Sequence, residues 1–190
     1  MHASGRAARP RSRRGWGWHQ LADPWAQLIV DDAGVVEGEL VLDVGAGLGA
    51  LTGPLLAVGA HVVAVELHDA RARRLEERWK DPKSGRLTVV KADVHQLRLP
   101  RRPFRVVASP PYAVSSLLMR RLLASGSRLI AADLVLQRAA AARWSAGDAS
   151  GAGRWSRQFT LELGRPVPRR AFRPPPKVDS AVLVVRRRAP

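Results

Sequence analysis

The feature that most restricts the fold is an apolar segment, residues 40–44, that runs directly into the glycines Gly45, Gly47 and Gly49. A glycine-rich turn between a strand and a helix lets the main chain approach a ligand closely at the carboxyl end of a sheet. Parallel strands need a long, usually helical, crossover to return to the same edge. The segment therefore predicts a fold in which strands and helices alternate.

The rest of the chain continues this alternation. Segments with strand character lie at 40–44, 62–66, 86–91, 104–108 and 129–134, and segments with helical spacing at 24–30, 50–58, 70–80 and 115–124. Two late apolar stretches, 158–163 and 181–185, flank a proline-rich segment and are expected to close the sheet as an antiparallel pair. We predict an α/β, Rossmann-like fold with a mostly parallel seven-stranded sheet and helices on both faces.

The charge indicates the class of partner. The chain has 190 residues and a formal net charge of +16, and clustered cations bind nucleic acid by releasing counterions from its phosphates. The length suits one catalytic domain, which we place at 15–190, behind a basic, low-complexity tail at 1–14 that we expect to be disordered.

Composition also excludes several classes of site. Without cysteine, the chain has no disulfide, thiol nucleophile or cysteine-based metal site, and its five histidines lack tight ligand spacing, so we predict no metal. No apolar run approaches the roughly 20 residues of a membrane span, and the basic N-terminus lacks an apolar signal core. We expect a cytoplasmic, monomeric protein that does not bind a membrane.

Two cofactors fit the glycine-rich turn. Residues 45–50 satisfy the G-x-G-x-x-A pattern of dinucleotide-binding proteins, and Glu66, at the end of the next strand, can hold a ribose diol in either case. Asp43, before the first glycine, and Asp93, after the third strand, favour S-adenosylmethionine, because an acid at the latter place can accept a hydrogen bond from the adenine amino group. The alternative role for Asp93 is a turn or helix cap.

The motif Ser109-Pro110-Pro111-Tyr112 follows the strand at 104–108 and indicates methylation of an amino nitrogen. The exocyclic amine of a nucleobase is a poor nucleophile because its lone pair is delocalised into the ring. A catalyst must therefore accept hydrogen bonds from the N–H groups of this amine. The Ser109 hydroxyl and the Pro110 carbonyl can do so from a backbone stiffened by two prolines. Tyr112 offers a ring on which the base can stack. The alternative is a proline-stiffened turn after a strand.

Together these motifs resemble those of the Erm-type and related dimethyladenosine rRNA adenine N6-methyltransferases, over about residues 16–188. The matching segments are 42–47, Glu66, Ala92-Asp93, Ser109-Pro110-Pro111-Tyr112, 134–138 and 172–182, the last of which resembles the family's F-x-P-x-P-x-V-x-S segment. The resemblance implies a class I S-adenosylmethionine-dependent methyltransferase fold. It also implies methylation of adenine N6 in 23S rRNA near the peptidyl-transferase region, which confers resistance to macrolide-type antibiotics.

The resemblance further implies roles for individual residues. Ser109 and Pro110 take the target amine, while Tyr112 and Phe172 sandwich the flipped base. The cofactor-binding residues would be His19, Leu21, Gly45, Gly47, Glu66, Leu67, Asp93, Val94 and Ser109.

Three departures from the family pattern bear on activity. The family usually has Asn where this chain has Ser109, and a hydroxyl is a single donor and acceptor where an amide separates its oxygen from its NH₂, so we expect weaker turnover or a single methyl. In place of the family's Q-N-F-like entry motif, this chain has Gly17-Trp18-His19-Gln20-Leu21. The family's C-terminal helical domain has no counterpart after Val185, so we expect the catalytic domain and its arms to grip the RNA.

Arginine clusters are the candidates for RNA contacts. Arg169, Arg170 and Arg173 are the strongest, because they flank Phe172. Further clusters lie at 6–14, 101–102, 120–121 and 186–188.

Two other functions stay open. A DNA amino-methyltransferase also uses a Ser-Pro-Pro-Tyr motif, but such enzymes commonly need a separate target-recognition region. A non-catalytic RNA-binding module would keep the fold and lose turnover through Ser109, but has no need of an intact cofactor pocket.

Overall fold

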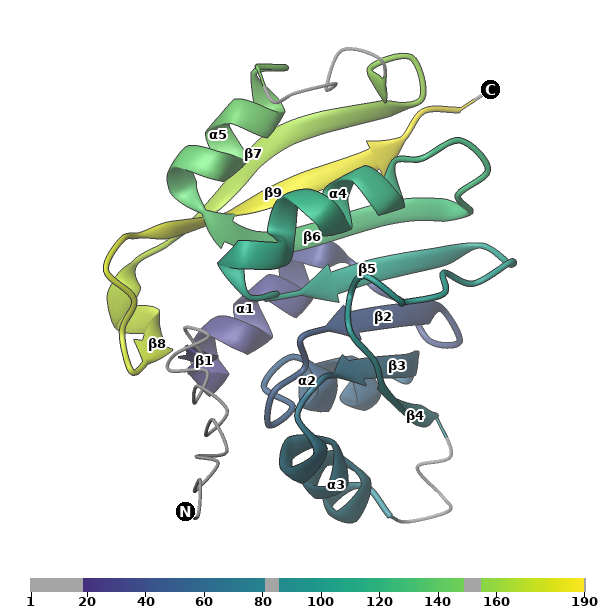
Figure 1. The fold of residues 1–190 in the computed structure, drawn as a ribbon, viewed down its shortest axis with the longest axis vertical. Coiled ribbons are helices and arrows are strands. Elements are labelled where there is room, and N and C mark those ends of the chain that lie inside the picture. Colours follow the sequence, from purple (N-terminus) through teal and green to yellow (C-terminus); the bar gives the residue numbers. More distant parts are fainter. Residues whose placement is uncertain (1–18, 81–85, 149–154, 190) are drawn as a thin grey trace, which may run out of the picture.

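The computed structural model describes residues 19–80, 86–148 and 155–189. Its centre is a seven-stranded sheet in the order β4-β3-β2-β5-β6-β9-β7 (Figure 1). The strands are β2 (Leu40–Val44), β3 (His61–Glu66), β4 (Leu87–Lys91), β5 (Phe104–Ala108), β6 (Leu129–Gln137), β7 (Phe159–Val167) and β9 (Ser180–Arg187). Strands β2 to β6 are parallel, and β9 pairs antiparallel with both β6 and β7. The predicted mostly parallel sheet with a late antiparallel pair is confirmed.

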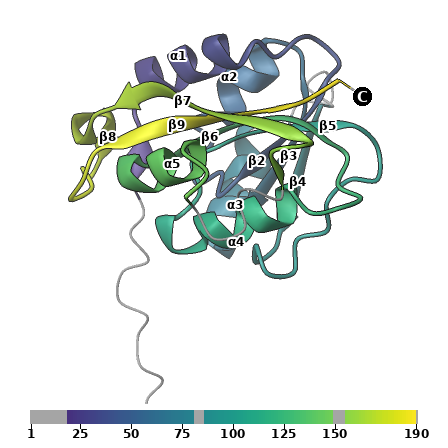
Figure 2. The same cartoon turned by 90° about the horizontal axis from the view of Figure 1, so that it is seen from above.

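Helices cover both faces of the sheet, as predicted (Figure 2). Helices α1 (Asp23–Ala33) and α2 (Thr52–Ala57) lie against one face, and α4 (Ser115–Leu122) and α5 (Arg138–Ser145) against the other, while α3 (Asp69–Arg78) packs near β3 and β4. Neighbouring strand residues point to opposite faces. Val106 and Val107 of β5 are accordingly both fully buried, yet belong to different apolar clusters. Burial on both faces explains why the central strands β2 and β5 are largely apolar.

Two parts of the fold are not anticipated by the sequence pattern. Helix α5 follows β6 directly and sets Trp144 against Trp155, with ring centroids 5.5 Å apart. The strands β1 (Gln20–Leu21) and β8 (Phe172–Arg173) form a separate antiparallel ribbon, in which Leu21 lies opposite Phe172. A two-residue strand has no periodicity to detect, so only the tertiary structure reveals the pairing.

The predicted tail at 1–14 lies outside the described residues. Within the described ranges, no helix is both long and apolar enough to cross a membrane.

Candidate active site

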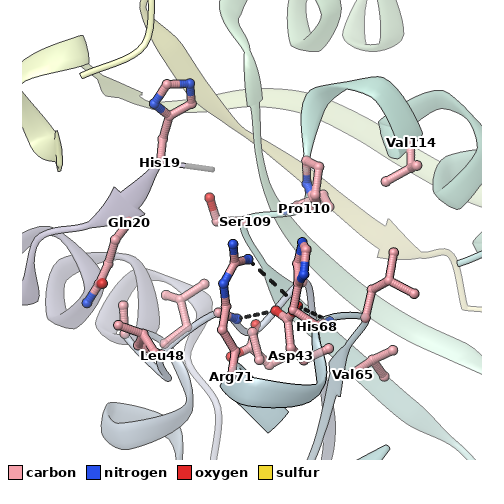
Figure 3. A pocket seen from close by; sticks show the side chains of 18 of the residues that line it. His19, Gln20, Asp43, Leu48, Val65, His68, Arg71, Ser109, Pro110 and Val114 are labelled. Carbon is pink, nitrogen blue, oxygen red and sulfur yellow. Dashed lines mark hydrogen bonds and ion pairs between the residues drawn. The ribbon is translucent and has the colours of Figure 1, made fainter. Parts of the chain in front are cut away.

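A cavity of about 560 Å³ opens at the carboxyl ends of strands β2 to β5 (Figure 3). All the residues predicted to serve catalysis or to hold the cofactor line it: His19, Leu21, Gly45, Gly47, Glu66, Leu67, Asp93, Val94, Ser109, Pro110, Tyr112 and Phe172. Residues far apart in sequence meet here because the carboxyl ends of parallel strands share one edge of the sheet.

The turn after β2 needs glycine for two separate reasons. Gly45 and Gly47 have φ values of 79° and 60°, which disfavour other residues. A Cβ on Gly45 would lie 3.0 Å from Cδ of Pro111 and 3.2 Å from Cα of Pro110. The glycine turn and the Pro-Pro segment are therefore in direct contact, and a side chain at position 45 would push them apart.

Glu66 holds the glycine turn from the end of β3. Its side chain is 4% exposed; Oε2 accepts a hydrogen bond from the Gly47 N–H at 2.9 Å, and Oε1 accepts one from the His68 N–H at 2.8 Å. Arg71, on α3, places Nη1 3.7 Å from Oε1. A carboxylate oxygen has two acceptor sites, so Oε2 can still accept a hydrogen bond from a ribose hydroxyl.

A buried acid, Asp43, forms part of the cavity wall before the turn. Thr52 Oγ1 donates to Asp43 Oδ2 at 2.7 Å, whereas Oδ1 has no hydrogen-bond partner among the described residues. Burial raises the pKa of Asp43 to about 7, although the Thr52 hydrogen bond opposes the rise. A free buried acceptor fits a ligand with positive charge, and S-adenosylmethionine carries a sulfonium and an ammonium group.

On the β4 side, Asp93 lines the cavity and also caps its own turn. Its Oδ1 accepts the His95 N–H at 2.9 Å and lies 2.7 Å from His95 Nδ1. The two interpretations offered by the sequence, a turn cap and a cavity residue, are therefore compatible.

The Ser-Pro-Pro-Tyr motif lines the cavity on the β5 side. Ser109 points into the cavity (Figure 3). Tyr112 begins a short 3₁₀ helix, η2 (Tyr112–Val114), and its hydroxyl lies 2.7 Å from Oγ of Ser180 on β9. Burial raises the pKa of Tyr112 above its ordinary value, so its hydroxyl stays protonated at neutral pH.

The β1–β8 ribbon and the residue before it, His19, form a further part of the cavity lining. His19 Nδ1 lies 2.7 Å from the carbonyl oxygen of Pro174, and the His19 ring is 6.3 Å from that of Tyr112. Phe172, 3% exposed, enters the cavity lining through its pairing with Leu21. The ribbon thus brings the early and late segments of the chain to one place.

Some lining residues were not singled out from the sequence. His68 and Arg71 line the cavity beside Glu66, and Leu48 lines it from the glycine turn. The only sequence signal for these residues is their position within the glycine-rich turn or shortly after Glu66. Ser180 lies within the matched segment 172–182, but nothing in that segment indicates that its partner is Tyr112.

The arginine clusters differ in what their side chains contact. Arg169, Arg170 and Arg173 are exposed, on η4 (Arg169–Ala171) and β8 beside Phe172. In contrast, Arg186 donates to both carboxylate oxygens of Asp133 at 2.9 Å. Arg187 donates from Nε to the Leu129 carbonyl at 2.6 Å. Part of the positive charge therefore stabilises the fold, and the cluster at 186–188 is a weaker RNA candidate than its charge suggests.

The cluster at 120–121 is divided in the same way. Arg120 is exposed, whereas Arg121 donates to main-chain carbonyls of the segment after β4. Only the first of the two therefore remains a candidate for contact with RNA.

The strand order, with β9 reversed beside the edge strand, and the glycine turn at the cavity are those of a Rossmann-like, S-adenosylmethionine-dependent methyltransferase. Residues 11–190 match the ribosomal RNA adenine dimethylase family, and the chain belongs to that family.

Individual relatives agree with this assignment. The chain is 34% identical over 170 residues to an rRNA adenine N-6-methyltransferase of Corynebacterium diphtheriae, covering 89% of this chain and 64% of the relative. It is 36% identical to ribosomal RNA small subunit methyltransferase A of a Synechococcus species, covering 92% of this chain and 67% of the relative. The crystal structure of the 23S rRNA methyltransferase ErmE superposes with a TM-score of 0.79 at 30% identity, covering 89% of this chain and 70% of that one.

Proposed function

We propose that this chain transfers a methyl group from S-adenosylmethionine to N6 of an adenine in ribosomal RNA. The observation that carries the proposal is the contact of Gly45 with Pro110 and Pro111. The contact supports the proposal because the glycine-rich turn and the Ser-Pro-Pro-Tyr motif line the same cavity. Neither a dinucleotide-binding protein nor a pure RNA-binding module accounts for both.

Each wall has a separate task in this proposal. Glu66 accepts a hydrogen bond from the ribose, and Asp93 accepts one from the adenine amino group of the cofactor. His19, Leu21, Leu67 and Val94, which also line the cavity, enclose the cofactor. S-adenosylmethionine, when bound, supplies an electrophilic methyl group.

On the β5 side of the cavity, the Ser109 hydroxyl and the Pro110 carbonyl accept hydrogen bonds from the target amine. These hydrogen bonds favour the pyramidal nitrogen needed for in-line attack on the methyl group. Tyr112 and Phe172 stack on the flipped base. Arg169, Arg170 and Arg173 contact phosphates next to it.

For the RNA itself, we propose 23S rRNA near the peptidyl-transferase region, with resistance to macrolide-type antibiotics as the consequence. The similarity to ErmE, a 23S rRNA methyltransferase, supports this target. The small-subunit methyltransferase of Synechococcus supports 16S rRNA as the second candidate at a similar identity.

One assay separates these targets. The protein is incubated with labelled S-adenosylmethionine and, separately, with 23S rRNA, 16S rRNA and duplex DNA, and the modified base is mapped by primer extension and mass spectrometry. Label at a 23S adenine, with macrolide resistance in an expressing host, is the expected result. Label only in 16S rRNA refutes the 23S target, label only in DNA refutes the rRNA proposal, and no cofactor binding by calorimetry refutes methyl transfer altogether.

A further inference from the structure

We propose that Arg121 is a positioning residue for the cofactor, because its guanidinium fixes the turn that carries Asp93 and Val94 into the cavity. The inference rests on the proposed function only in taking that cavity to bind S-adenosylmethionine. Arg121 itself does not line the cavity, so it acts through the turn.

The hydrogen bonds of Arg121 all go to one short stretch of main chain. From the last turn of α4, Nη1 donates to the Val94 carbonyl at 2.9 Å and also to the His95 carbonyl, and Nη2 donates to the Leu97 carbonyl. Three carbonyl dipoles thus converge on one cation. The planar guanidinium, with five donors in a fixed fork, suits such a convergence better than the compact ammonium of lysine.

The turn is capped by Asp93, whose Oδ1 accepts the His95 N–H at 2.9 Å. Its own main-chain hydrogen bonds are Gln96 N–H to Asp93 O at 2.9 Å and Leu97 N–H to Val94 O at 3.4 Å. The second is beyond the usual N–H···O range. Charge-assisted hydrogen bonds are about twice as strong as neutral ones, so the hydrogen bonds from Arg121 add a strong constraint, which ties the Val94, His95 and Leu97 carbonyls to α4.

Helix α4 also joins the two walls of the cavity. It begins at Ser115, directly after Tyr112–Val114, and its last turn carries Arg121. Its other face is anchored in the core through Leu118 and Leu122, both fully buried. A rigid helix therefore sets the amine-side motif at one end and holds the cofactor-side turn at the other.

The test compares Arg121→Met, which removes every donor, with Arg121→Lys, which keeps the charge. Arg128→Met is the matched control, because Arg128 is exposed and borders the same surface hollow as Arg121. Arg121→Met is expected to weaken binding of S-adenosylmethionine, measured by calorimetry, about tenfold, which corresponds to about 1.4 kcal/mol. Arg121→Lys should recover part of the loss, and Arg128→Met should bind like wild type.

The accompanying measurements distinguish positioning from general damage. For Arg121→Met, RNA affinity and kcat at saturating cofactor should stay within about twofold of wild type. The effect of the substitution should be a higher KM for the cofactor. Wild-type cofactor affinity in both Arg121 variants overturns the inference, as does an equal loss of RNA affinity and kcat. If Arg121→Met does not fold, the test rests on Arg121→Lys. Weaker cofactor binding by that variant than by wild type supports the inference, and wild-type binding overturns it. Failure of wild type to bind S-adenosylmethionine overturns the proposed function instead.

Discussion

The hydroxyl groups of Tyr112 and Ser180 lie 2.7 Å apart, so the Ser-Pro-Pro-Tyr motif after β5 is tied to the first residue of β9. Ser180 is 1% exposed and pairs with Gln137 on β6 and with Val167 on β7. It is therefore held by strands on both sides. The hydrogen bond to Ser180 therefore fixes the orientation of the Tyr112 ring, which we propose stacks on the target base.

Removing this hydrogen bond from either side should have the same effect. Ser180→Ala and Tyr112→Phe are each expected to lower single-turnover methylation by the worth of one hydrogen bond, about 0.5–1.5 kcal/mol. The double variant should be no slower than either single one, because both changes remove one interaction. Strictly additive losses would contradict the coupling.

Tyr112→Ala and Phe172→Ala should lower single-turnover methylation further, by about 1–3 kcal/mol for each stacking surface removed.

Asp43 is expected to make folding stability depend on pH. Its folded-state pKa of about 7 lies above its ordinary value of 3.8. Between these values the folded state holds a proton that the unfolded state has released, so the free energy of unfolding falls as pH rises. Asp43→Asn removes this effect and should gain stability relative to wild type from about pH 4 to about pH 8, by up to roughly 4 kcal/mol.

Urea denaturation over this pH range measures the difference between Asp43→Asn and wild type. Asp148→Asn, at an exposed position, is the control and should follow wild type. A difference between Asp43→Asn and wild type that does not change with pH would show that Asp43 does not titrate in this range.

Glu66→Gln should weaken cofactor binding by disturbing the glycine turn. An amide has only one oxygen, so its NH₂ group must face the N–H of Gly47 or of His68, donor against donor. We expect a loss of about 1.5–3 kcal/mol in S-adenosylmethionine affinity by calorimetry, and a similar loss for Asp93→Ala. RNA affinity should barely change. Glu76→Gln, exposed on α3, is the control; unaltered cofactor affinity in both site variants would rule out the assignment.

The arginines beside Phe172 should contribute affinity rather than sequence choice. Replacing Arg169, Arg170 and Arg173 by Gln is expected to weaken RNA binding and to lower the slope of log K against log salt by about 0.7–0.9 for each phosphate that is no longer neutralised. The methylated position should not change. Arg74→Gln, exposed on α3, is the comparison, and an equal slope in the two variants would show that the three arginines do not touch phosphate.

Ser109 should limit the number of methyl groups added. Its hydroxyl is a poorer partner for the amine than the family's Asn, and monomethyl-adenine must reseat a bulkier group beside Ser109 and Tyr112. Wild type is expected to give mainly monomethyl-adenine, and Ser109→Asn to raise the dimethyl fraction, counted by mass spectrometry of digested rRNA. Mainly dimethyl-adenine in wild type, or an unchanged ratio in the variant, refutes this role.

The sequence alone determined the parts of the protein that depend on local pattern. Strands buried on both faces are continuous apolar runs, so the segments at 40–44, 62–66 and 104–108 were predicted within a residue of β2, β3 and β5. Many of the residues that line the cavity, among them Gly45, Glu66 and Ser109, lie at or directly after the ends of these strands. Their common location could be predicted because parallel strands end at one edge of the sheet.

Only the tertiary structure decided the contacts between segments that have no local signature. The β1–β8 ribbon, the pairing of Tyr112 with Ser180, and the convergence of three carbonyls on Arg121 all join positions remote in sequence. An arginine in a charged run looks the same in sequence whether it faces phosphate or main chain. The choice is made by burial and by unpaired carbonyls nearby, and these exist only once the chain has packed.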